Sequence, residues 1–280
     1  MIMDLPCARE IYRYAMEAKT DLAEKMRESL CIIEEILNLY PNEFSTSFNG
    51  GKDSMVVFQL VRAALVHRQE YDPHKLALFD IDLGPGSEFP EMLKFVSDLI
   101  CNNEATLLVY NARGINTEYN GLKYTSPLNS ENMRGVELMK ELLKAVIHES
   151  SSKAIFMGVR KSDPQGKYLG LVTPSTQDWP QMFRVCPILN WSFVDVWDFL
   201  LRFNVPFCEL YLRGYTSLGS PDKTIPSPFL KRGKCIENST YQALKERGIY
   251  IEEEVMHYSE EYLPAFFLPL NVEERSNRIH

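Results

Sequence analysis

The first part of the chain alternates between helical and strand-like patterns of apolar residues. Over residues 6–39 apolar side chains recur at steps of three and four with charges between them, which predicts a helical region. The run 44–48 alternates aromatic and small hydroxyl residues and predicts a strand. Residues 53–68 are mostly apolar at helical spacing, so a buried helix is expected directly after that strand.

The same alternation continues to about residue 160. Further strands are predicted at 75–81, 105–110 and 153–159, and helices at 89–100 and 131–149. Strands that alternate with helices are typical of a parallel sheet with right-handed crossovers. The sequence therefore predicts an α/β protein in which ligands bind beyond the carboxyl ends of the strands.

The alternation of strand-like and helical patterns ends after residue 160. A polar loop is interrupted by prolines at positions 164, 174, 180 and 187. Segment 192–203 then opens with a Ser-x-x-Asp pattern, typical of a helix capping box, and continues as a helix. Trp191 and Trp197 are expected in the core because they accompany apolar residues of this helical pattern, and the elements after 204 are expected to be short.

Composition excludes several classes of protein. The net charge of −8 disfavours a general nucleic-acid binder, which would carry a basic footprint. The six cysteines form no C-x-x-C pair, so reduced thiols of a cytosolic protein are expected rather than a zinc site or redox dithiol. No apolar run is long enough to span a membrane, and acidic residues throughout the first 26 positions argue against a targeting peptide.

The segment "FNGGKDS" links the first predicted strand to the helix that follows it. Glycines permit a tight turn, the helix N-terminus favours an anion, and Lys52 adds a positive charge. The segment is not a Walker A loop, because no glycine lies four residues before Gly50 and Asp53 replaces the magnesium-binding hydroxyl. A phosphate loop is predicted here, with a simple β-α turn as the alternative.

The loop resembles the S-x-G-G-K-D-S pyrophosphatase loop of the adenine nucleotide hydrolases and the sulfonucleotide reductase and sulfurylase group. Asn49 stands where most members have Ser, and "FNGGKD" is similar to the eukaryotic FMN adenylyltransferases, or FAD synthases. Four later blocks also resemble that branch: "GVRKSDPQG", "DWPQMFRVCPILNWSFVDVWDFL", "CELYLRGYTSLGS" and "EERSNRI". They follow the family's order over residues 45–279.

The resemblance implies a Rossmann-like doubly wound sheet of the PP-loop ATP pyrophosphatase type. We expect a single domain over 1–280, with an α/β nucleotide-binding core at 40–190 and an extension at 191–280 that completes the flavin site. The implied reaction makes FAD and pyrophosphate from ATP and FMN with Mg²⁺. No obligate protein partner and no membrane association are expected, and the chain is expected to work alone in the cytoplasm.

The resemblance also implies the residues that bind ATP. They lie in the loop and at the ends of the first, second and fourth predicted strands: Thr46, Ser47, Asn49, Gly50, Gly51, Lys52, Asp53, Ser54, Ile81, Asp82, Val159 and Arg160. Asn49 can donate its amide to the α-phosphate. Asp53 is expected to act through magnesium or to orient Lys52, with a stabilising acid at a helix N-terminus as the alternative. For Ile81 and Asp82 a plain strand end is nearly as good an interpretation.

The flavin-binding residues implied by the resemblance are Asp163, Thr176, Gln177, Asp178, Trp179, Arg184, Arg275 and Arg278. Asp163 is a candidate for metal or substrate orientation, or else a turn-forming Asp-Pro residue. Thr176 departs from the family, which usually has Asp three residues before the tryptophan. Arg275 and Arg278 match the C-terminal arginines that neutralise the FMN phosphate, a task suited to bidentate guanidinium groups. The implied catalytic set is Asn49, Asp53, Asp163, Arg275 and Arg278.

Three other functions are weighed. A sulfonucleotide reductase would carry a reactive cysteine in a Glu-Cys-Gly-x-x-His-like context, whereas Cys235 lies in "KRGKCIENS". A tRNA-thiolating enzyme would need paired cysteines and a basic surface. An inactive nucleotide sensor is opposed only weakly by the intact stretch from Asn49 to Asp53.

Overall fold

A computed structural model describes residues 5–73, 76–84, 86–102, 105–111, 115–119, 121–127, 133–233 and 238–279. The chain divides into two compact units. The first contains residues 1–49, 53–84 and 96–191, and the second contains residues 50–52, 85–95 and 192–280. Segment 50–52, in the loop predicted to bind phosphate, therefore belongs to a different unit from the residues on either side of it.

The first unit is built on one mostly parallel sheet, which within the described residues has eight strands in the order β4-β5-β3-β2-β1-β6-β8-β7. The strands are β1 (Phe44–Ser47), β2 (Leu78–Asp82), β3 (Leu107–Asn111), β4 (Thr117–Tyr119), β5 (Leu122–Thr125), β6 (Ala154–Phe156), β7 (Val172–Pro174) and β8 (Phe183–Val185). Strand β1 pairs in parallel with β2 on one side and β6 on the other. The α/β fold class predicted from the sequence is confirmed.

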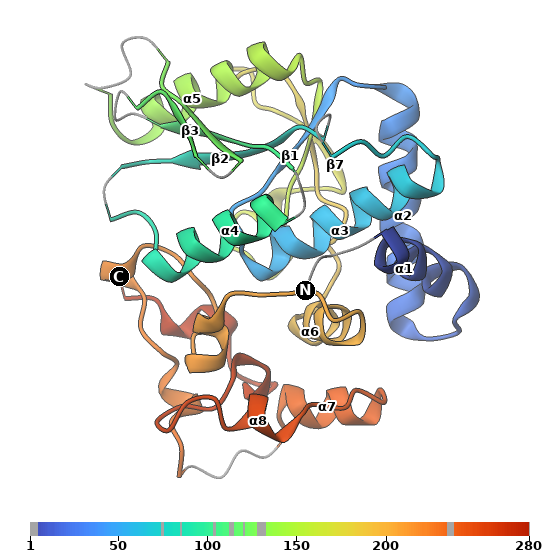
Figure 1. Cartoon of the computed structure of the whole chain (residues 1–280), viewed down its shortest axis with the longest axis vertical. Helices are drawn as coiled ribbons and strands as arrows, with labels where there is room; N and C mark the ends of the chain where they lie inside the picture. The colour runs from blue at the N-terminus through green and yellow to red at the C-terminus, as the bar shows by residue number, and fades with distance from the viewer. Residues whose placement is uncertain are drawn as a thin grey trace. The chain divides into compact units, whose positions relative to one another are not determined.

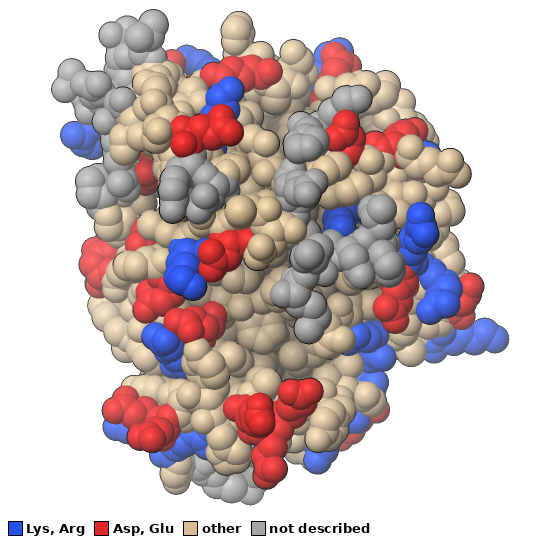
Figure 2. Space-filling model, in the orientation of Figure 1, with Lys and Arg blue, Asp and Glu red and all other residues tan. Residues whose placement is uncertain are grey.

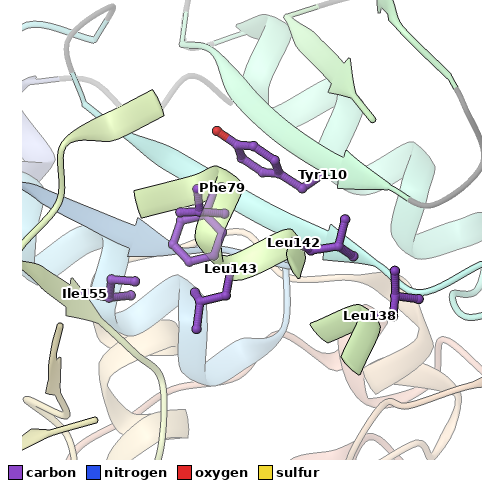
Figure 3. Packing of buried hydrophobic residues seen from close by; sticks show 7 residues of the cluster. Phe79, Tyr110, Leu138, Leu142, Leu143 and Ile155 are labelled. Carbon is purple, nitrogen blue, oxygen red and sulfur yellow. The ribbon is translucent and has the colours of Figure 1, made fainter. Parts of the chain in front are cut away.

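Helices cover both faces of this sheet, with α5 (Gly135–Ser150) on one face and α3 (Lys52–His67) on the opposite one (Figure 1). Beneath α5 a cluster of apolar side chains fills the space between helix and strands (Figure 3). The cluster consists of Phe79, Tyr110, Leu138, Leu142, Leu143, Val146 and Ile155, all buried. Burial of apolar side chains contributes about 1.5–3 kcal/mol each, so this layer is a principal source of stability for the sheet.

The predicted helical regions are present, although residues 131–132 of the helix predicted at 131–149 lie outside the described residues, and the first region contains a break. The helical pattern over 6–39 forms two helices, α1 (Leu5–Glu17) and α2 (Asp21–Leu39), rather than one. The break lies at Thr20, which has an extended backbone. Its side-chain oxygen caps α2 by accepting a hydrogen bond from the Ala23 N–H. A capping threonine can start a new helix in phase with the previous one, so periodicity alone does not reveal the break.

Two antiparallel strand pairs close the ends of the sheet, and the sequence did not predict either of them. Strand β4 pairs with β5 at one end, and β7 pairs with β8 at the other. The polar loop expected after residue 160 thus contains a strand, β7, and a 3₁₀ turn at Gly166–Tyr168. These four strands have three or four residues each and mix apolar residues with polar, charged or proline residues, so they do not stand out from a loop.

The second unit contains short elements, as expected. They are α6 (Phe193–Arg202), α7 (Thr240–Glu246), α8 (Glu253–Met256) and the 3₁₀ turns η2 (Glu209–Arg213), η3 (Pro221–Lys223), η4 (Pro228–Leu230), η5 (Ala265–Phe267) and η6 (Glu274–Asn277), while α4 (Pro90–Asn102) is shared between the units. The predicted capping box is present: Ser192 caps α6, and Asp195 bonds back to Ser192.

An aromatic cluster forms the centre of the second unit. Trp197 is fully buried and meets Phe193, Phe207, Tyr211 and Phe266 edge to face, with ring centroids 5.1–6.1 Å apart. Such pairs add about 0.5–1.5 kcal/mol each beyond their buried area. The expectation that Trp197 is a core residue is confirmed, and Trp191 is likewise buried, in the first unit, where its indole N–H donates to Ser29.

The described cysteines are free thiols that differ in exposure, and Cys7 is intermediate. Cys31 and Cys101 are exposed, whereas Cys186 and Cys208 are buried, and burial raises the pKa of each buried thiol to about 11. Because the thiolate is the reactive form, the buried pair should resist alkylation. In native protein treated with iodoacetamide at pH 8, we expect mass spectrometry to find Cys31 and Cys101 modified and Cys186 and Cys208 unmodified. Rapid labelling of Cys186 without unfolding would contradict this environment.

Charge on the surface is mixed. The face in Figure 2 carries acidic and basic side chains next to one another. Lys52 and Arg160 are buried and contribute little to the surface charge. Within the part of the chain that the structure describes, every helix is too short or too polar to cross a bilayer.

Candidate functional site

The strand ends that the sequence singled out lie at one edge of the sheet. Strand β1 lies between β2 and β6 and is parallel to both, so the carboxyl ends of all three point the same way. The residues at or just after these ends are Thr46 and Ser47, Ile81 and Asp82, and Val159 and Arg160. The Asp82 carboxylate accepts a hydrogen bond from the Gly84 N–H at 2.9 Å, so it also shapes the turn after β2.

The loop after β1 is a tight turn into a helix. Gly50 has a φ of 73°, a left-handed conformation that suits glycine, and α3 begins two residues later at Lys52. Asn49 accepts a hydrogen bond from the Ser54 hydroxyl at 2.9 Å, which fixes the amide at the start of the loop. The backbone thus forms the helix N-terminus at which an anion is favoured.

In the first unit a buried arginine forms an ion pair with the first turn of α3. Arg160, which is 1% exposed, pairs with Asp53 at 2.7 Å between Nε and Oδ1. Asp163 accepts a hydrogen bond from the Arg160 backbone N–H at 2.8 Å, and its own carbonyl accepts one from the Gly166 N–H. Asp163 therefore has the turn-forming role weighed from the sequence, while a role for Asp53 or Asp163 at a metal stays a prediction.

Two glycines permit the close approach of these segments. A Cβ at Gly158 would lie 2.8 Å from the Asp53 carbonyl carbon and from the Ser54 nitrogen. A Cβ at Gly166 would lie 1.9 Å from the Arg160 carbonyl oxygen. The block "GVRKSDPQG" thus packs its backbone directly against the first turn of α3 and against itself.

The side chain of Lys52 lies in a cage made by the second unit. Its ammonium group forms an ion pair with Glu274 and lies 5.5 Å and 5.9 Å from the ring centroids of Phe193 and Tyr211. Its backbone N–H donates to the Tyr211 hydroxyl at 3.1 Å. The side chains in this ion pair are only 3% and 11% exposed, so the lysine charge is neutralised inside the protein.

The second unit also contains the C-terminal arginines. Arg278 is half-buried and donates to the hydroxyls of Ser217 at 2.8 Å and Thr224 at 3.3 Å. Its Nε is buried and has no hydrogen-bond partner among the residues that the structure describes. Burial lowers the pKa of Arg278, and the nearby charge of Arg275 lowers that pKa further. The positive charges of Arg275 and Arg278 repel each other, and the described side-chain partners of Arg278 are neutral hydroxyls. An anion would therefore stabilise this pair.

The flavin segment expected at 176–179 forms a turn between β7 and β8. Thr176, Gln177 and Asp178 are exposed, and the Trp179 N–H donates to the Thr176 carbonyl at 2.9 Å. Asp178 pairs with Lys140 of α5 at 2.9 Å, and the hydrogen bond from that lysine lowers the pKa of the Asp178 carboxyl. Roles in flavin binding for these residues stay predictions.

Two further residues of the expected flavin site pack against this turn or its strands. Trp179 packs on the cluster beneath α5 and receives the Lys140 ammonium 5.3 Å from its ring centroid. Arg184 donates to the Pro174 carbonyl at 3.0 Å. Arg184 thus ties β8 to β7, which is a structural task compatible with, but separate from, ligand contact.

Across the described ranges no group of three or more His, Cys, Asp or Glu side chains is arranged to hold a metal. Mg²⁺ bound with a nucleotide commonly uses one or two carboxylates, several waters and the phosphates themselves. Asp53 at the first turn of α3 and Asp82 at the end of β2 are carboxylates at the loop edge of the sheet, which fits such a shared site.

A parallel sheet with a glycine turn and a helix N-terminus at its central strand defines a class of α/β proteins with a ligand site at that edge. Residues 43–226 match the family described as "Phosphoadenosine phosphosulfate reductase domain". The chain belongs to this family, and within it to the FAD synthases, because it is 34% identical over 218 residues to the "Probable FAD synthase" of Schizosaccharomyces pombe. That match covers 77% of this chain and 73% of the fission-yeast protein.

Other similar proteins agree with this assignment. The "Probable FAD synthase" of Caenorhabditis elegans is 34% identical over 268 residues, covering 95% of this chain but 42% of the worm protein. The chain thus spans less than half the length of its worm relatives. The crystal structure of Candida glabrata FMN adenylyltransferase matches with a TM-score of 0.73 at 24% identity, over 99% of this chain and 96% of that one, and confirms the fold.

Sequence reasoning missed three groups of residues that shape the site. They are the partners of Lys52 (Phe193, Tyr211, Glu274), the hydroxyls that hold Arg278 (Ser217, Thr224) and the glycines at close approaches (Gly158, Gly166, Gly219). Most of them lie inside the blocks that resemble the family, so the signal was present but gave no individual role. Which residue each would contact depends on tertiary structure.

Proposed function

We propose that the protein is an FMN adenylyltransferase, which makes FAD and pyrophosphate from ATP and FMN. The proposal is supported by two groups of residues whose charge and hydrogen-bond donors suit an anion. One is the glycine turn and helix N-terminus at Asn49 to Ser54, and the other is the pair Arg275 and Arg278. A reaction that joins two phosphate esters needs both, and the similarity to proteins named FAD synthase over most of the chain supports the assignment.

In this reaction a phosphate oxygen of FMN forms a bond to the α-phosphorus of ATP. The bond from that phosphorus to the oxygen between the α- and β-phosphates breaks, and that oxygen leaves as a terminal oxygen of pyrophosphate. The second pKa of a phosphate monoester is about 6, so the attacking group is already close to a dianion and needs no general base. The protein must therefore position two anions and stabilise the charge that develops.

The residues divide this work according to their surroundings. In this proposal the Asn49 amide, whose oxygen accepts a hydrogen bond from the Ser54 hydroxyl, donates to the α-phosphate, and the loop N–H groups and Lys52 bind the β- and γ-phosphates. Asp53 and Arg160 keep the first turn of α3 in place. Arg275 and Arg278 neutralise the FMN phosphate, and Ile81, Asp82 and Val159 bind the nucleoside.

Mg²⁺ would neutralise charge on the phosphates of ATP, and Asp53, Asp82 or Asp163 would be the carboxylates that hold it. We further propose that the turn at 176–179, with Trp179 and Arg184, contributes to flavin binding. Location in the cytoplasm and action without an obligate protein partner also remain predictions.

The direct test is an assay with purified protein, ATP, Mg²⁺ and FMN. We expect FAD, detected by chromatography and fluorescence, and pyrophosphate to appear in equal amounts, and EDTA to abolish both.

Asn49→Ala should lower kcat by about 10²-fold if its amide stabilises the charge on the α-phosphate. Asn102→Ala, at an exposed asparagine at the end of α4, is the control. Binding of ATP without FAD formation would favour a nucleotide sensor, and thiol-dependent turnover of a sulfonucleotide would favour a reductase.

A further inference from the structure

We propose that Glu274 is a displaceable counter-ion for Lys52, which holds the loop lysine in the absence of nucleotide and must be exchanged for phosphate when ATP or pyrophosphate binds. This inference rests on the proposed function and concerns how that same site sets its affinity. Both residues belong to the second unit, although 222 positions separate them in the sequence.

The environment of Lys52 requires an anion. Its ammonium group is almost fully buried, and removing such a charge from water is costly unless it is paired. The rings of Phe193 and Tyr211 attract the ammonium group but carry no net charge. Glu274 provides the negative charge, and a phosphate oxygen offers the same chemistry in a stronger form.

The carboxylate of Glu274 is held in place by its backbone. The Thr216 hydroxyl donates to the Glu274 carbonyl at 2.5 Å. Three residues later, the Asn277 amide donates to the carbonyls of Ser217 and Ile225, each at 3.0 Å. These bonds anchor η6 on the segment 216–225, so Glu274 is fixed by buried contacts rather than presented on a loose tail.

Two alternative partners for one lysine make its binding equilibrium a competition. A polyphosphate that uses Lys52 must break the ion pair with Glu274, so part of its interaction energy is spent on this exchange. The same exchange lowers the cost of losing pyrophosphate, because Glu274 can take Lys52 back. The ion pair thus lowers the affinity for pyrophosphate, which favours release of this product after the reaction.

The test is a double-mutant cycle on pyrophosphate binding. Calorimetry with Mg²⁺-pyrophosphate, without FMN, is done on the wild type, Glu274→Gln, Lys52→Met and the double variant. We expect Glu274→Gln to tighten pyrophosphate binding by about tenfold and to have much less effect when Lys52 is already Met. Glu273→Gln, at an exposed neighbouring acid, should change the dissociation constant less than twofold.

The cycle separates this proposal from a general effect of charge. Glu274 also bears electrostatically on Arg278, so an equal gain in the Lys52→Met background would mean that Glu274 acts on the site at large, and would overturn the inference. Unchanged or weaker binding in Glu274→Gln would overturn it too. Because pyrophosphate binding needs no turnover, a wild type that makes FAD while these results fail would leave the proposed function standing.

Discussion

We expect Arg278→Ala to lower kcat/KM for FMN by about 10²- to 10³-fold while the KM for ATP changes little. Truncating one partner of a desolvated charged pair costs about 2–5 kcal/mol. Arg278 is half-buried, and within the described ranges its Nε has no hydrogen-bond partner and its terminal nitrogens donate to the weakly basic hydroxyls of Ser217 and Thr224. A phosphate is the anion that would satisfy it, so the loss should fall on the phosphate-bearing flavin substrate. Steady-state kinetics with each substrate varied in turn measures both constants.

Two further variants sharpen this prediction. Arg278→Lys keeps the charge without the planar fork and should give an intermediate loss. Gly219→Ala leaves the arginine in the sequence but should reproduce the defect, because its Cβ would lie 1.4 Å from Arg278 Nη1 and would displace the guanidinium. Lys223→Ala removes an exposed cation from the same unit and should have no effect. Riboflavin, which lacks the phosphate, should bind Arg278→Ala as well as wild type, and an equal loss for both flavins would argue against a phosphate contact.

We expect Gly166→Ala to lower the free energy of unfolding by about 2–4 kcal/mol, since overpacking against a rigid neighbour costs about 1–3 kcal/mol and occasionally more. The added Cβ would lie 1.9 Å from the Arg160 carbonyl oxygen and 2.7 Å from its carbon, and backbone atoms cannot rotate away as a side chain can. The turn that carries Asp163 must therefore open. Because Arg160 pairs with Asp53, the first turn of α3 should loosen as well, and the KM for ATP should rise. Urea denaturation and steady-state kinetics report the two effects.

Gly170→Ala provides the matched control, four residues away. A Cβ there would meet Thr173 Oγ1 at 3.5 Å and the Val172 carbonyl at 3.7 Å, which are ordinary contacts. Its stability should stay within about 0.5 kcal/mol of wild type, as for most surface substitutions. If both alanine variants unfolded at the same urea concentration as wild type, the close approach of Gly166 to Arg160 would be wrong.

The central part of the sheet could be predicted from the sequence, and the ends could not. Strands β2, β3 and β6 lie in mainly apolar segments and β1 alternates an aromatic with small hydroxyl residues, and each of the four overlaps its predicted range. Parallel strands of this kind are buried on both faces, which makes their apolar pattern strong. The pairs β4–β5 and β7–β8 are short and partly exposed, so local sequence carries little sign of them.

The candidate site divides in the same way. The loop from Asn49 to Ser54 could be predicted because its function depends on local backbone geometry, which glycine and the start of a helix make visible. The ion pair of Lys52 with Glu274 joins residues from opposite ends of the chain, and Ser217 is 61 positions from Arg278. Contacts between residues so distant in sequence are decided by the fold, and a single sequence contains no direct record of them.

The strands at the two ends of the sheet also bear on how the protein behaves at high concentration. Both β4 and β7 are three residues long, and β7 ends in Pro174, which has no N–H to offer. An outermost strand exposes unpaired backbone groups that another molecule can extend into a continuous ribbon, and short length and proline are two means of preventing it. Resistance to intermolecular strand addition is therefore built into both margins of this protein.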